Sequence, residues 1–336
     1  MKRILLLALL GTAPVGALLA QTANNVIIDR VQQGAPPSAP TAKEASAVKD
    51  EKGDLDGGTQ RLAETRKLPF KLTLGYDLQV YYTSNVFLAP NNTVEAVIVA
   101  NTLTTSAEFN SFAVGQTLMT PTASLVYQHY NHALGTGDQA RKNLDFDAYS
   151  IPLVLRVRYG NNWEFGLGVT PTAVYSLEGP PNYALTYKSV TTAATARKLI
   201  SLSKNQILSL GGSIDYVVTD APSPTGPLGY RDDRNDKFDT NLDVGYYYLK
   251  DRWVFGPYAR VTYSDYSHYQ EGSFTDVNRE DILGSVGLTA SYNINAWAVA
   301  RATTSYDWRH PVGNSFVDYS YKTANIGLGL SLSVSF

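Results

Sequence analysis

The sequence contains no cysteine and, after its first twenty residues, no long apolar run. Without cysteine the chain forms no disulfide and carries no lipid-modified cysteine of the lipoprotein kind. A transmembrane helix needs about 20 consecutive apolar residues, and no later segment supplies them. Neither sign of charge is in excess, because 28 basic residues stand against 30 acidic ones. This balance gives no indication of nucleic acid or of an acidic macromolecule as a partner.

The first residues predict a secretory signal peptide. The chain starts with a short basic segment, and apolar and small residues then run from Ile4 to Ala20. A basic start followed by a short apolar run is typical of a signal peptide. The alternative is a membrane anchor, for which this run is short. We therefore expect residues 1–20 to be a signal peptide, cleaved after Ala20.

Residues 21–68 predict a flexible linker. They are rich in Pro, Ala, Gly, Lys and Asp and contain no apolar stripe. A segment of this composition cannot bury enough apolar surface to fold alone. We expect a periplasmic linker over 21–68, followed by one folded domain over 69–336.

From residue 70 onward apolar and polar residues alternate. In FKLTLGYDLQVYY the apolar side chains from Phe70 to Val80 share one face, and polar side chains share the other. Strict alternation indicates a strand with one apolar face. Similar segments lie at 116–129, 146–159, 162–176, 206–219, 236–249, 252–266, 280–293, 296–309 and 319–336, and weaker ones at 94–110 and 185–202. The total is about twelve strands, with about ten or fourteen as open alternatives.

The connections between these segments come in two lengths. Short turns such as GNN at 160–162 and LKDR at 249–252 alternate with long polar loops such as 220–235 and 264–280. This alternation is expected of an outer-membrane barrel. A soluble sandwich is the alternative, but its strands usually run about 5–6 residues. The sequence therefore predicts an all-β fold, a transmembrane antiparallel β-barrel in the Gram-negative outer membrane.

The last strand has the pattern of an assembly signal. Its apolar face carries Leu328, Leu330, Leu332, Val334 and Phe336. Lipid offers no hydrogen bonds to an unpaired edge, so the last strand is expected to close on the first. The apolar alternation ending on Phe336 resembles the C-terminal signal that outer-membrane proteins present to the barrel-assembly machinery. We expect that machinery and outer-membrane lipid as partners.

One stretch suggests a family. GYDLQVYYTSNVFL at 75–88 is followed by TLMTPTASLVY at 117–127. These segments resemble β-barrel porins of Gram-negative bacteria, in which a Tyr-rich first strand runs into an SN-[IV]-F segment. The resemblance extends over about 70–336 and implies the barrel fold rather than a particular activity.

The polar faces carry charges of both signs in mid-strand. In this register the lumen candidates are Lys71, Asp77, Arg156, Arg158, Glu164, Asp215, Asp243 and Arg260, joined by Lys237 and Asp239. We expect Arg156 or Arg158 to pair with Glu164 across the GNN hairpin. Such a network either braces a narrow barrel or lines a small aqueous pore.

Few residues are candidates for catalysis or metal binding. His129 and His132 face opposite ways on a strand, so no metal site is expected there, and solvated loop histidines are the simpler interpretation. A rim hydrolase could draw on residues of the outer loops, namely Asp232, Asp233, Asp236, Asp265, His268, Asp307 and His310. A calcium site among Asp232, Asp233 and Asp236 is another open alternative. No catalytic residue, metal or cofactor is assigned.

Three functions therefore remain open. The first is a narrow, weakly selective porin for small solutes, because the polar faces carry mixed charges. The second is a non-conducting structural or adhesive barrel that acts through its external loops. The third is a hydrolase at the barrel rim.

Overall fold

A computed structural model describes residues 69–132, 138–160, 162–177, 183–221, 232–269 and 277–336. The predicted signal peptide (1–20) and linker (21–68) lie outside the described residues. Within the described part of the chain, no helix has the length and apolar character needed to cross a membrane. Helix α4 (Gln139–Lys142) is a single turn, with Asp138 as its N-cap.

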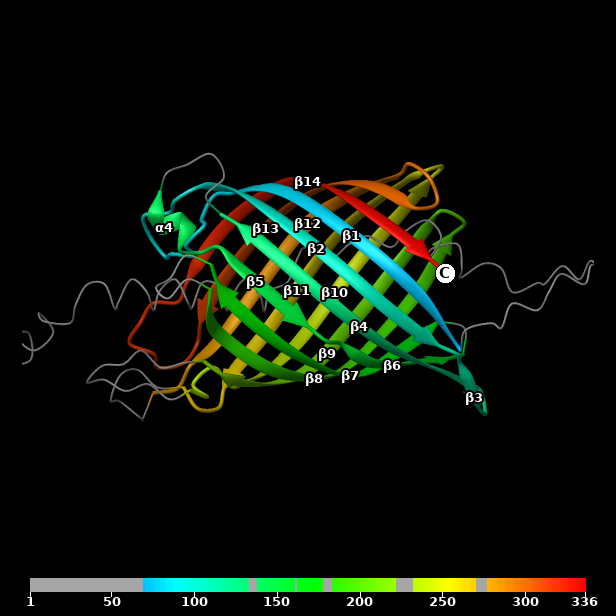
Figure 1. Ribbon diagram of the computed structural model, residues 1–336, viewed down its shortest axis with the longest axis horizontal. Coiled ribbons are helices and arrows are strands. Elements are labelled where there is room, and N and C mark those ends of the chain that lie inside the picture. The colour runs from blue at the N-terminus through cyan, green and yellow to red at the C-terminus, as the bar shows by residue number, and fades with distance from the viewer. Residues whose placement is uncertain (1–68, 133–137, 161, 178–182, 222–231, 270–276) are drawn as a thin grey trace, which may run out of the picture.

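Long antiparallel strands make up most of the described chain (Figure 1). Their bounds are β1 (Phe70–Thr83), β2 (Ala96–Phe109), β3 (Phe112–Val114), β4 (Thr117–Asn131), β5 (Phe146–Ser150), β6 (Leu153–Tyr159), β7 (Trp163–Ser176), β8 (Ala184–Ser203), β9 (Gln206–Asp220), β10 (Lys237–Lys250), β11 (Trp253–Tyr266), β12 (Glu280–Asn293), β13 (Ala298–Pro311) and β14 (Tyr321–Ser335).

The strands close into a barrel. Strand β1 pairs with β2 on one side and with β14 on the other, so that Leu74 lies opposite Val334. Segments β5 and β6 are halves of one strand, interrupted at Pro152, which has no N–H to donate to the ladder. Segment β3 pairs with the start of β4, and the short hairpin they form extends beyond the wall (Figure 1). The barrel therefore has 12 strands, and the predicted number and closure are confirmed, including the weaker segments 94–110 and 185–202.

The outer wall of the barrel is apolar. Large side chains at alternate strand positions point outward and are exposed. Examples are Leu167, Ile214 and Leu242, which are 57%, 51% and 66% exposed. A water-soluble sheet buries such residues, whereas a membrane barrel presents them to lipid. The fold is a transmembrane antiparallel β-barrel, as the period-two alternation predicted.

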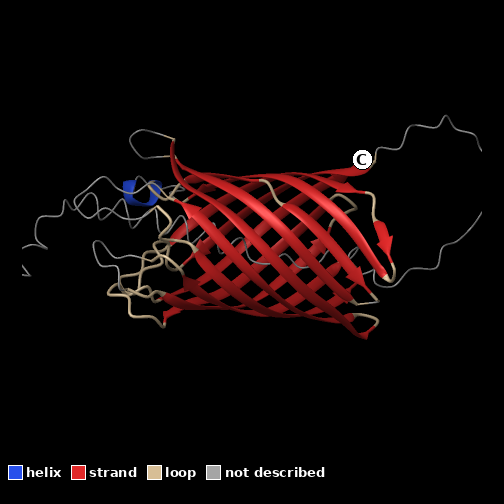
Figure 2. Ribbon diagram, turned by 90° about the horizontal axis from the view of Figure 1, so that it is seen from below, coloured by secondary structure: helices blue, strands red, loops and turns tan. Residues whose placement is uncertain are grey.

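The two ends of the barrel differ (Figure 2). The turns at 204–205, 251–252 and 294–297 are tight, and the C-terminus lies at this same end. The longer connections, which follow β1, β4, β7, β9, β11 and β13, lie at the opposite end together with α4. We call these the tight-turn end and the long-loop end. Trp163 and Trp253 start strands at the tight-turn end and are exposed, as expected for an interfacial aromatic girdle.

Candidate functional site

The lumen is the first candidate site, and its charged residues lie on the inward face of the wall. The strand ladders place the lumen candidates at inward positions: Lys71, Asp77, Arg156, Arg158, Glu164, Asp215, Lys237, Asp239, Asp243 and Arg260. They do not form one cluster. The structure divides them among separate groups along the barrel.

One group surrounds Arg156 towards the tight-turn end. The Nε atom of Arg156 lies 3.2 Å from Glu164 Oε1, and its Nη1 atom lies 3.7 Å from Glu108 Oε2. The expected pair with Glu164 therefore forms through Arg156, although Arg158 is the residue directly opposite Glu164 in the ladder. The side chains of Arg156 and Glu164 remain 40% and 36% exposed. The charged groups in this part of the barrel therefore keep contact with solvent.

A second group lies at the closing strands. Asp77 on β1 accepts hydrogen bonds from Arg301 Nη2 on β13 and from Ser331 Oγ on β14, the latter at 2.6 Å. Gln79 Nε2 donates to the same carboxylate at 2.7 Å. Sequence reasoning found Asp77 but missed Arg301, because both faces of the segment after Trp297 carry small or apolar residues. The group ties three strands together where the barrel closes.

A third group is built on β9, β10 and β11. Asp215 accepts hydrogen bonds from Asn241 Nδ2 at 2.7 Å and from Ser213 Oγ at 2.9 Å. Asp243 lies opposite Arg260 in the ladder. The Asp243 carboxylate leans over Gly211, where a Cβ atom would lie 2.5 Å from Asp243 Oδ1. The absence of a side chain at Gly211 therefore leaves room for this carboxylate.

An apolar cluster lies at the long-loop end of the barrel. Inward wall residues Ile98 and Phe146 pack with Val86 and Leu144, which come from the connections after β1 and β4, and all four are fully buried. Asn85 orients the first of these connections, because its side-chain amide bonds to Ala89 N, Ala89 O and Lys322 O at 2.8–3.1 Å. We call this group the mouth cluster; its buried members are Val86, Leu88, Ala96, Ile98, Ala100, Tyr130, Leu144, Phe146, Ala148, Val174, Tyr187, Ala221 and Tyr321.

A buried charged group lies beside the mouth cluster. Asp281 is fully buried and lies 2.9 Å from Arg279 Nη2 and 3.6 Å from Arg309 Nε. The Arg279 guanidinium stacks at 3.8 Å from the Tyr319 ring centroid and 4.2 Å from that of Tyr266. Sequence reasoning did not find this group, because Arg279 and Tyr319 belong to connections. Both groups are buried, whereas the Arg156 group keeps contact with solvent.

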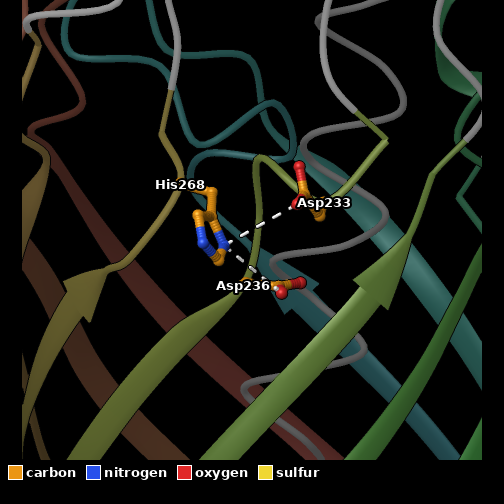
Figure 3. A group of neighbouring side chains, drawn as sticks. All are labelled: Asp233, Asp236 and His268. Atoms are coloured by element: carbon orange, nitrogen blue, oxygen red, sulfur yellow. Dashed lines mark ion pairs between the residues drawn. The ribbon is translucent and has the colours of Figure 1, made fainter.

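A second candidate site lies at the rim of the long-loop end (Figure 3). Asp233, Asp236 and His268 converge there, and their ligand atoms lie within 4.8 Å of one another. The larger rim group expected for a hydrolase does not form. Asp307 points into the lumen and accepts from Asn325 Nδ2 at 2.6 Å, while His310 occupies an outward position of β13.

The expectation of solvated loop histidines is wrong for His132 and incomplete for His129. His132 is 1% exposed and stacks on Tyr130 inside the barrel. His129 faces outward, with its Nδ1 atom 2.8 Å from the buried carboxylate of Asp147. The two histidines do face opposite ways, as the strand period requires.

Tyrosines surround the outward carboxylate of Asp147. Tyr127 donates to Asp147 Oδ1 at 3.1 Å, and Tyr149 shares a hydrogen bond of 2.8 Å with Tyr183 in the connection before β8. This bond to Tyr149 raises the pKa of Tyr183 above its ordinary value. The group belongs to the aromatic zone near the long-loop end.

Comparisons with known proteins address the fold. No protein-family model matches the sequence, and no curated protein matches it either. An outer membrane channel from Pseudomonas putida F1 shares 14% identity at a TM-score of 0.47, over 84% of this chain and 100% of that one. The NanC porin shares 10% identity at a TM-score of 0.41, over 76% of this chain and 98% of that one. The beta domain of the Bordetella autotransporter BrkA shares 11% identity at a TM-score of 0.38, over 78% of this chain and 98% of that one.

These likenesses concern barrel architecture alone. The fold assignment rests on the strand ladders and on the closure of β1 with β14. The resemblance to Gram-negative porins is therefore a resemblance of fold, with outer-membrane porins and channels among the similar structures.

Proposed function

We propose that the protein is a narrow, weakly selective channel for small polar solutes in the outer membrane, and that it rests closed at its long-loop mouth. In outer-membrane barrels the long loops face outside and the short turns face the periplasm. This orientation places the mouth cluster on the cell surface and the Arg156 group towards the periplasm. The linker 21–68 is then periplasmic.

The observation that carries the proposal is the contrast between the two halves of the lumen. Arg156 and Glu164 are about two-fifths and one-third exposed, whereas Val86 and Phe146 at the mouth are fully buried. A braced, solid barrel would bury its charges throughout, because a charge without solvent needs a close partner. Charges of both signs along one passage favour weak selectivity.

Opening the mouth is the direct test. Val86→Ser removes apolar contacts of the closed mouth and buries a hydroxyl there, at a cost of about 1.5–3 kcal/mol to the closed state. If the open state exposes this residue, the open fraction rises about 10- to 100-fold, since each 1.4 kcal/mol is tenfold. Val97→Ser makes the same change on the outer wall, where the valine is 40% exposed. Single-channel recording in planar bilayers should show longer openings for Val86→Ser alone.

Selectivity tests the lumen residues. In the Val86→Ser background, Arg156→Ala/Arg158→Ala removes two inward cations, and the reversal potential under a salt gradient should shift towards cation preference. Lys188→Ala/Lys322→Ala removes two cations from outward positions and should leave the selectivity unchanged. An unchanged reversal potential in the arginine variant would refute the assignment of the selectivity residues.

A non-conducting structural or adhesive barrel is the second candidate, favoured by the depth of the mouth cluster. Silence of the wild type and of the correctly folded Val86→Ser variant would support it. The rim hydrolase has less support, because Asp307 and His310 lie on opposite faces of β13.

A further inference from the structure

The rim group in Figure 3 has the spacing of metal ligands rather than of a hydrogen-bonded cluster. His268 Nδ1 lies 3.6 Å from Asp236 Oδ2 and 3.8 Å from Asp233 Oδ2. Both separations exceed hydrogen-bond length. Ligands at about 2.0–2.1 Å around a tetrahedral zinc ion stand about 3.4 Å apart. Shifts of a few tenths of an ångström would bring His268 to this spacing from each carboxylate, and all three ligand atoms already lie within 4.8 Å of one another.

Asp236 is held in place before any ion binds. Its Oδ1 atom accepts from Thr219 N at 2.6 Å and from Thr219 Oγ1 at 2.8 Å, which directs Oδ2 towards His268. A turn closed by the bond from Asp236 N to Asp233 O, 3.0 Å long, places both carboxylates on one side of the chain. The bond from Ser267 N to Asp236 O, also 3.0 Å, fixes the neighbouring connection beside them.

The burial of Asp236 is an independent indication of a cation. Its side chain is only 6% exposed, and its Oδ2 atom accepts no hydrogen bond from the described residues. A buried carboxylate needs a compensating charge, because leaving water costs several kcal/mol per ion. His268 at 3.6 Å is too distant to satisfy this oxygen by a hydrogen bond. A metal ion between the two side chains would satisfy both.

We propose that Asp233, Asp236 and His268 form a zinc-binding site at the rim, joining the connection after β9 to the connection after β11. Carboxylate and imidazole ligands together suit zinc, with water in the fourth position. Calcium takes about 6–8 oxygen ligands, so the imidazole disfavours the calcium alternative. Asp233 and His268 are 35% and 41% exposed, which leaves the site open to ions from solution.

Zinc titration of the full-length refolded barrel tests the site. Isothermal calorimetry should give one zinc ion per chain, and cobalt(II) should give visible absorption typical of a four- or five-coordinate ion. His268→Ala should weaken zinc binding about 100-fold, since one of three protein ligands is lost. Asp236→Asn should weaken it as well, while the amide keeps the shape of the carboxylate.

His310→Ala is the matched control, because it removes a histidine from the same end of the barrel but outside the rim group. It should bind zinc like the wild type. The proposal fails if the wild type binds no zinc, or if His268→Ala binds it as tightly as the wild type. Preferential calcium binding that is insensitive to His268→Ala would also overturn it. Heat resistance of each variant in SDS shows that the barrel has folded, independently of metal.

Discussion

Loss of Arg301 should weaken the barrel where its first and last strands meet. The carboxylate of Asp77 on β1 is bonded by Arg301 on β13 and by Ser331 on β14, with Gln79 as a third donor. The side chains of Arg301 and Asp77 are 11% and 23% exposed. Arg301→Ala therefore leaves a largely buried carboxylate without its cation.

The size of the effect follows from this burial. Breaking a fully buried ion pair by removing one partner costs about 3–5 kcal/mol. Asp77 retains Ser331 and Gln79 and some contact with solvent, so we expect a loss of about 1–3 kcal/mol in the free energy of unfolding. Lys188→Ala is the matched control. Its pair with Asp220 spans 3.6 Å with side chains 53% and 62% exposed, and such pairs contribute about 0.5 kcal/mol or less.

Urea unfolding of the barrel in lipid vesicles, followed by tryptophan fluorescence, measures both changes. The double variant Asp77→Asn/Arg301→Met should recover part of the loss, because it leaves no unpaired charge in the lumen. Equal stability of Arg301→Ala and Lys188→Ala would refute the reasoning. A double variant that is less stable than the sum of its single changes would refute it too.

Three further predictions concern the wall. Gly327→Ala should destabilise the barrel by about 1–3 kcal/mol, because the new Cβ atom would lie 2.9 Å from a β1 backbone oxygen. Gly75→Ala, on the same pair of strands, places its Cβ atom no closer than 3.8 Å to a neighbour and should cost under about 1 kcal/mol in the same urea assay. Leu242→Arg places a cation on the lipid-facing wall and should cost about 2–4 kcal/mol in vesicles, whereas Phe316→Arg in a connection should cost about 1 kcal/mol or less. Phe336→Ala should slow assembly of the barrel in cells, measured as the appearance of the SDS-resistant form, and an unchanged rate would remove this residue from the assembly signal.

The period of two made the strands and the lumen register predictable. Once Phe70 and Val80 share the lipid-facing side, Asp77 must face the lumen, and a slip of one residue would reverse every side chain. The long uninterrupted alternation in the last strand likewise predicted its pairing with the first. Even weak segments such as 94–110 were predictable as strands, because closure requires an even number of strands when both ends of the domain lie on one side.

Contacts between distant segments were not predictable in this way. Arg301 was missed because small residues on both faces of its segment hide the period. Val86 lies in a connection, and its burial depends on Asn85 bonding to Lys322, far away in the sequence. The burial of His132 was missed because it follows the end of a strand. Only the folded barrel shows that it stacks on the ring of Tyr130. Local pattern determines the strands, whereas the mouth cluster depends on how the connections fold back.

In the proposed channel the lumen is closed on the long-loop side and accessible from the tight-turn side. Because the natural chain has no cysteine, a single introduced thiol reports its own accessibility. Thr195 lies opposite Gly166 on the lumen face, whereas Thr93 is exposed in the connection after β1.

Labelling with a membrane-impermeant maleimide is the direct measurement. Added outside intact cells, the reagent should label Thr93→Cys and leave Thr195→Cys unreacted. After the periplasm is made accessible, it should label Thr195→Cys as well. Reaction of Thr195→Cys from outside, as fast as that of Thr93→Cys, would contradict the closed mouth.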